Sequence, residues 1–221
     1  MFFRRLLDLF VSPTKVFDDI RDSRMGWWQP WVWNSILAIV GNWLLIPAQQ
    51  VMMQFNPKMT PETLAMAAKM AYVQLLFAPA ICLIVAFLAA GISYPVVTLQ
   101  SKEATFKKHF NLILCAQVVF WLGYVITGIL LRVRGVDNIQ SPEDLRMSFS
   151  LRMLAPEANA IVGGLLGSFE FFTLWVLALV VVGVKRVFNL RTGQAVACVI
   201  PLWISYAIYM IVVEMITHIG A

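Results

Sequence analysis

The sequence predicts an all-helical polytopic membrane protein with five transmembrane helices. Of its 221 residues, 60% are hydrophobic and only 13% are charged, whereas soluble domains are nearer half apolar and a quarter charged. Its apolar runs are long enough to cross a bilayer, because a hydrocarbon core of about 30 Å requires roughly 20 apolar residues in a helix. We expect a single membrane domain over residues 1–221. Its crossings are predicted at 31–53, 70–97, 110–131, 161–184 and 196–216.

The N-terminal segment 1–26 is predicted to be amphipathic and to lie in the cytosol or at the membrane interface. In its first part the large apolar residues share one helix face: Phe2, Phe3, Leu6, Leu7 and Phe10. That pattern is typical of a helix among the lipid headgroups, and a helix packed on the protein itself has the same pattern. Ser12 and Pro13 then form a helix start, a capping hydroxyl followed by proline at the first helical position. The helix that runs to Asp22 has a charged face, which is either a solvated surface or a partner site.

The connection between the third and fourth crossings, 133–160, contains a second amphipathic element. The segment Ser141–Asp144 begins a short helix, because it carries a capping hydroxyl and places acidic residues where the helix dipole favours negative charge. The apolar stripe of this helix consists of Leu145, Phe149 and Met153. We therefore expect it to lie along the membrane surface.

The distribution of basic residues indicates how the chain is oriented. Eleven of the 17 lysines and arginines lie in segments on the same side as the N-terminus, and six lie on the other side. Because cytoplasmic loops of membrane proteins are enriched in Lys and Arg, we expect the N-terminus in the cytoplasm and the C-terminus outside. The same distribution explains the formal charge of +5 without a nucleic acid partner. The predicted partners are the lipid bilayer, proteins at the cytosolic face and further copies of the chain in a homo-oligomer.

Glu170 is the one charged residue in the predicted crossing 161–184. Counted from the start of this run, it lies about 13 Å along the helix axis, near the middle of the membrane, where charge is expensive. Two interpretations stay open. A neutral Glu170 hydrogen-bonded to Asn42, Gln117 or a backbone carbonyl would tie helices together. A Glu170 in a wet cavity would handle a proton or cation, or contact a lipid headgroup.

Further amide side chains lie inside the predicted crossings. Asn42, Gln74 and Gln117 are expected to face other helices, because polar side chains in lipid find their partners across helix interfaces. Together with Glu170 they form the candidate polar or ion-handling site.

Small residues precede Glu170 in the same run. Gly163 with Gly167, and Gly164 with Ser168, are spaced four apart, so each pair lies along one helix face. Small residues at this spacing allow another helix to approach closely. We expect this face to pack against a helix of the same chain, with homodimerisation as the alternative.

Glu214 and His218 form a pair at the outer end of the last crossing, since a spacing of four places both on one side of a helix. An interfacial ion pair is expected, because a metal site requires three or four ligands and nothing nearby in the sequence completes one.

The cysteines lie inside apolar runs, which indicates buried positions and no disulfide framework: Cys82, Cys115 and Cys198. The motifs of metalloproteases, esterases and phosphate loops are missing from the sequence. We therefore predict no enzyme activity, catalytic residue, metal or cofactor.

The order of several phrases along the chain resembles a known family. The phrase SPTKVFDDI is followed by a Trp/Pro-rich entry to the first crossing, then by ATFKKHFNLILCA, then by FFTLWVLALVVVGVKRVFNLRTGQAVACVI over the last hairpin. In this order they resemble the Yip family, and its bacterial branch in particular, from about Ser12 to Val213. The resemblance implies five helices, a cytosolic N-terminus, the bacterial inner membrane and association with partners. The Asp-Leu-Tyr-Gly-Pro motif of eukaryotic relatives is replaced here by GWWQPWVWN, so binding of Rab GTPases is not implied.

Two functional hypotheses follow. The first is a non-enzymatic membrane protein, active in membrane trafficking or membrane organisation, that recruits partners. Its cytosolic face would be built from 1–24, 102–108 and 185–191. The second is a small oligomeric transporter or channel for an ion, proton or lipid that uses Glu170.

Overall fold

The computed structural model describes residues 2–55, 59–135, 138, 149–155 and 158–219, with side chains described as far as residue 216. Regular structure within these ranges is helical, which confirms the predicted all-helical class. The elements are α1 (Phe2–Val11), α2 (Pro13–Arg21), α3 (Trp28–Gln54), α4 (Pro61–Gln100), α5 (Phe106–Arg134), η3 (Leu151–Leu154), α6 (Ala160–Gly167), α7 (Phe171–Val187) and α8 (Thr192–Ile219).

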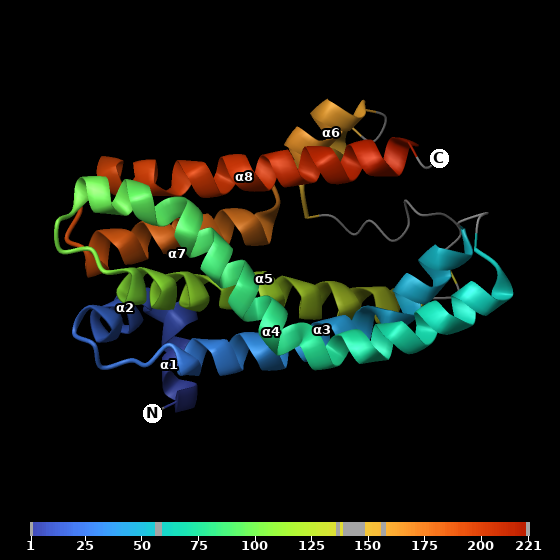
Figure 1. The fold of residues 1–221 in the computed structure, drawn as a ribbon, viewed down its shortest axis with the longest axis horizontal. Helices are drawn as coiled ribbons and strands as arrows, with labels where there is room; N and C mark the ends of the chain where they lie inside the picture. The colour runs from blue at the N-terminus through green and yellow to red at the C-terminus, as the bar shows by residue number, and fades with distance from the viewer. Residues whose placement is uncertain (1, 56–58, 136–137, 139–148, 156–157, 220–221) are drawn as a thin grey trace.

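Among the described residues, 4 helices are long and apolar enough to cross a membrane: α3, α4, α5 and α8. The predicted crossings 31–53, 70–97, 110–131 and 196–216 each lie inside one of these helices. The helices extend along the long axis of the molecule (Figure 1). At one end of this axis lie α1, α2 and the α4–α5 and α7–α8 connections, whereas the C-terminus of α8 lies at the other end.

The single helix predicted over 161–184 is wrong, because this run forms two helices. α6 ends at Gly167 and α7 begins at Phe171. Between them the chain is extended and pairs with the segment before η3. Phe171 donates its N–H to the carbonyl of Phe149 at 2.9 Å, and Leu151 donates to the carbonyl of Phe169 at 3.3 Å. Apolar composition alone did not reveal the break, since the pairing segment lies elsewhere in the chain.

α5 is the central helix of the bundle. In its candidate span 61% of the residues are buried, against 22% or less in the other candidate spans. It packs against α3, α4 and α7. Gly41 and Gly128 allow the close approach of α3, since a Cβ at either position would overlap the facing helix. These small residues had not been singled out from the sequence.

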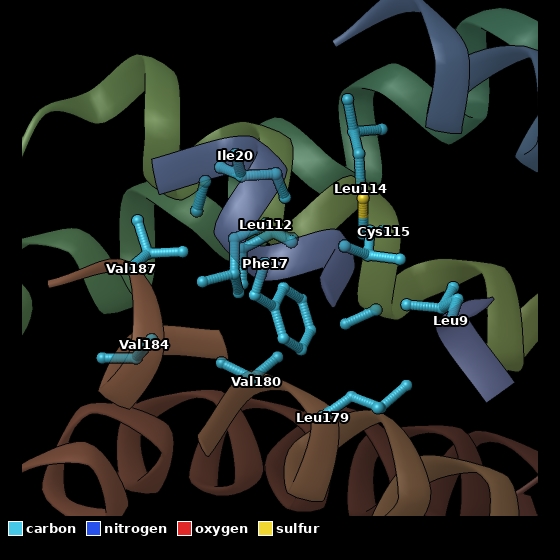
Figure 2. Packing of buried hydrophobic residues seen from close by; sticks show 14 of the residues in the cluster. Leu9, Phe17, Ile20, Leu112, Leu114, Cys115, Leu179, Val180, Val184 and Val187 are labelled. Atoms are coloured by element: carbon cyan, nitrogen blue, oxygen red, sulfur yellow. The ribbon is translucent and has the colours of Figure 1, made fainter. Parts of the chain in front are cut away.

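The N-terminal helices are part of the hydrophobic core. Phe17 of α2 is fully buried between Leu112 of α5 and Val180 of α7 (Figure 2). One side of the first amphipathic segment is thus packed on the protein itself. The side of α1 that includes Leu9 packs on the bundle, whereas Phe3 and two further residues of its other side, Leu7 and Val11, are exposed.

The helix predicted from Ser141 falls mostly on residues 139–148, outside the described residues. Its last part forms the short 3-10 helix η3. Phe149 packs edge-on against Phe172 at the start of α7, with ring centroids 5.5 Å apart. This contact places η3 beside the α6–α7 break.

Candidate functional site

Glu170 is the N-cap residue of α7. Its Oε2 accepts hydrogen bonds from the backbone N–H of Thr173 at 3.0 Å and from the Thr173 hydroxyl at 2.6 Å. The first N–H groups of a helix have no partner within the helix, and the positive end of the helix dipole favours a carboxylate there. Its described hydrogen bonds are thus local to α7, and neither Asn42 nor Gln117 is among its described partners.

The depth expected for Glu170 was counted along a continuous helix that the chain does not form. α7 has 17 residues and is therefore about 26 Å long. Glu170 lies at its first end, whereas Lys185 and Arg186 lie in its last turn. The carboxylate is thus separated from the basic end by nearly the thickness of a hydrocarbon core, about 30 Å.

Tyrosines of two other helices lie within electrostatic range of this carboxylate. Tyr206 of α8 interacts with Thr173 and Glu170. Tyr124 of α5 interacts with Glu170 and Tyr206. Glu170 itself is half-buried. Polar side chains of α5, α7 and α8 are therefore within electrostatic range of one another near the start of α7.

Tyr124 also lines a small cavity on its other side. This cavity, of about 160 Å³, is lined by residues of α3, α4 and α5, among them Asn42, Gln49 and Gln74. The structure thus brings together two of the predicted amides, Asn42 and Gln74, beside Tyr124, and Glu170 does not line this cavity. Gln117 does not line this cavity, and its buried side chain finds no hydrogen-bond partner among the described residues.

A buried ion pair joins η3 to α8. Nη1 of Arg152 lies 2.7 Å from Oε1 of Glu214, and the two side chains are only 9% and 8% exposed. The sequence paired Glu214 with His218 instead. His218 lies in α8, but its side chain is outside the described residues. No sequence signal could have found Arg152, because its partner lies far along the chain.

The small residues of α6 make room for these contacts. A side chain at Gly163 would collide with the Arg152 guanidinium, and one at Gly164 would collide with the backbone of Ile211 in α8. Gly167 faces Met210, and the buried Ser168 hydroxyl donates to the carbonyl of Leu165 at 2.7 Å. The face formed by these residues therefore packs within the chain.

The N-terminal helices are held on the bundle end by charged contacts. Asp18 of α2 accepts two hydrogen bonds from Arg186 of α7, at 2.6 and 2.8 Å. This guanidinium holds the pKa of Asp18 below its ordinary value of 3.8. Asp19 accepts a hydrogen bond from Arg5 of α1 at 2.8 Å, and Lys108 of α5 donates to the carbonyl of Arg21 at 2.7 Å. α1, α2 and the bundle are thus one packed unit.

Comparisons with known proteins place the chain in a family. The model of the Yip1 domain matches residues 7–213, from α1 almost to the end of α8. A comparison with curated proteins found no match, and a comparison with solved structures found none either. The match covers nearly the whole chain and agrees with the resemblance of the sequence and with its apolar helices. The chain is therefore an integral membrane protein that belongs to the Yip1 domain family.

Proposed function

We propose that the protein is a non-enzymatic membrane organiser that recruits protein partners through a platform at the α2 end of the bundle. This platform consists of α1, α2, the α4–α5 turn 101–105 and the α7–α8 turn 188–191. The observation that supports the proposal most is the docking of α2. Phe17 and the contact between Asp18 and Arg186 hold its outward face in a fixed place.

The charge of the platform indicates the kind of partner. All three aspartates of α2 and its C-cap are engaged by arginines of this chain: Asp18 by Arg186 and Arg21, Asp19 by Arg5 and Arg24, and Asp22 by Arg21 and Arg24. By contrast, several basic side chains are exposed at the same end: Lys15, Lys102, Lys185 and Arg191. An acidic protein surface complements this outward charge.

The topology that we propose has five crossings, with α7 as the fourth. α7 is about 26 Å long, close to a hydrocarbon thickness, and it is apolar up to its basic last turn. The platform would lie in the cytoplasm and the C-terminus outside the bacterial inner membrane, in agreement with the excess of basic residues on the platform side.

Deleting 1–24 is a poor test of recruitment, because it removes Leu9, Phe17 and Ile20 from the core. A photocrosslinking residue at the exposed position Thr14 tests the platform without this damage, with Thr63 at the start of α4 as the matched control. We expect an identified protein to be captured at Thr14 and not at Thr63. The double charge reversal Lys15→Glu with Arg191→Glu should reduce that capture at unchanged protein levels. Equal capture at both positions, or capture insensitive to the charge reversal, would contradict the proposal.

A second function, a conduit that uses Glu170, is favoured by the α6–α7 break. Interrupted helices whose ends meet at a polar site are typical of transporters. Tyr124 lines a cavity together with Asn42 and Gln74, and it lies within electrostatic range of Glu170. The variant Glu170→Gln keeps an acceptor for the Thr173 N–H but cannot ionise. Flux in proteoliposomes should then fall to the background level, whereas Glu62→Gln at the exposed start of α4 should leave it unchanged. Undiminished flux in Glu170→Gln would remove this second function.

A further inference from the structure

A groove with apolar walls runs along the outside of the bundle between α4 and α5. Its volume is about 570 Å³, within the range of small-molecule sites. One wall is formed by Ile84, Phe87 and Leu88 of α4, which are 58%, 57% and 58% exposed. Phe110 of α5 lines the other side, with its ring 6.4 Å from that of Phe87.

Two residues of the groove lining carry polar groups. Lys107, in the first turn of α5, is the one charged residue of its lining, and Trp27, just before α3, also lines it. Both belong to the end of the bundle where α1 and α2 are docked. Tryptophan with a nearby lysine is typical of the boundary between lipid and water. The lining of the groove therefore combines apolar side chains with two residues that are typical of the membrane boundary.

Lys107 differs from two other lysines of the chain, whose ammonium groups donate hydrogen bonds to other residues. Lys108 donates to the carbonyl of Arg21 and Lys185 to the hydroxyl of Thr192. Lys107 is exposed, and it forms no ion pair with any residue that the structure describes. In addition, Thr105 at the N-cap of α5 makes no side-chain capping hydrogen bond. An ammonium beside the positive end of α5 favours an anion at the mouth of the groove.

We infer that this groove binds an anionic glycerophospholipid. Lys107 and the Trp27 indole N–H contact the phosphate headgroup, and one acyl chain lies along Ile84, Phe87 and Leu88. An acyl chain fits walls that carry no charge, and the headgroup fits the single cation at the mouth. This site is separate from the platform proposed for protein partners, so either proposal can fail alone.

The test uses the full-length protein with a photocrosslinking residue at Ile84, in vesicles that contain equal amounts of phosphatidylglycerol and phosphatidylcholine. The control position is Ile200 on α8, an apolar residue with a similar exposure of 50%. We expect adducts with phosphatidylglycerol to exceed those with phosphatidylcholine about fivefold at Ile84, since one lysine near a membrane contributes about 1 kcal/mol toward anionic lipid. At Ile200 we expect no preference.

Two variants connect the preference to Lys107. Lys107→Gln should abolish it, whereas Lys102→Gln, an exposed lysine of the α4–α5 turn that does not line the groove, should keep it. Addition of inorganic phosphate should not compete, because the acyl chain provides most of the buried area. Equal labelling by both lipids at Ile84, an unchanged preference in Lys107→Gln, or displacement by phosphate alone would overturn the inference. Gel filtration of each variant verifies that the fold is intact. Because Lys107 is exposed, Lys107→Gln should change the stability of the fold only slightly.

Discussion

Glu170 illustrates how the surroundings of one residue decide its role. The sequence identified it as the lone carboxylate of an apolar run, and the composition of that run is as stated. It did not identify Glu170 as an N-cap, because glutamate is not among the preferred capping residues and the run continues without a proline or polar segment. The cap exists because Phe149 and Leu151 pair with the chain on either side of Glu170.

The capping role predicts a measurable loss of stability. Glu170→Ala removes the acceptor of the Thr173 N–H and should lower the free energy of unfolding by about 0.5–2 kcal/mol. Glu170→Gln should lose less, because its amide oxygen still accepts. Thermal unfolding in detergent provides the comparison, with Glu62→Ala at the exposed start of α4 as the control. If Glu170→Ala melts at the same temperature as the unaltered protein, the cap does not stabilise α7.

The ion pair of Arg152 and Glu214 predicts an asymmetric response to substitution. Arg152→Ala leaves the Glu214 carboxylate buried without this guanidinium, which should cost about 3–5 kcal/mol. The double variant Arg152→Met with Glu214→Met removes both charges and should be clearly more stable than Arg152→Ala. Thermal unfolding of these two variants and of the unaltered protein distinguishes the cases. A double variant that is no more stable than Arg152→Ala would show that the pair is not the source of the loss.

At the scale of elements, Pro47 couples α3 to α5. Proline has no N–H to donate, so the carbonyl of Trp43 lacks its usual helical partner. Arg132 of α5 donates to this carbonyl at 3.3 Å and to that of Leu44 at 3.1 Å, with its guanidinium 5.0 Å from the Trp43 ring centre. A proline inside one helix therefore frees one of the two carbonyls that bind the end of another.

The docking of α2 on α7 predicts a dependence on pH. Because the pKa of Asp18 is lowered in the folded protein, its contribution is present above the unfolded value of 3.8 and is lost as the pH falls through the lower folded value. The pair is partly exposed to solvent, so its contribution is small. Asp18→Asn should remove the contribution at neutral pH.

Limited proteolysis after Arg24 measures this docking. At pH 7, Asp18→Asn should be cleaved faster than the unaltered protein, and the difference should shrink as the pH approaches 3. Asp8→Asn, which removes only the weaker contact of 3.9 Å with Arg4, is the matched control. Equal cleavage rates at pH 7 would show that the ion pair does not hold α2.

At the scale of the whole molecule, the proposed topology makes a direct prediction. A cysteine at Lys15 on the platform and one at Thr63 at the start of α4 should lie on opposite sides of the membrane. The native cysteines at 82, 115 and 198 are fully buried and should not react. In intact cells an impermeant maleimide should label the cysteine at Thr63 and not the one at Lys15. Labelling of both positions, or of Lys15 alone, would invert or exclude the topology.

The sequence by itself determined the class of protein, its family resemblance, the position of four long helices and the residues most unusual in lipid. It did so because transfer of apolar residues into lipid depends on composition and run length, which are local properties. Only the tertiary structure decided where the run 161–184 breaks, which arginine meets Glu214 and how α1 and α2 join the core. These features depend on contacts between segments far apart in the chain, which no local pattern specifies.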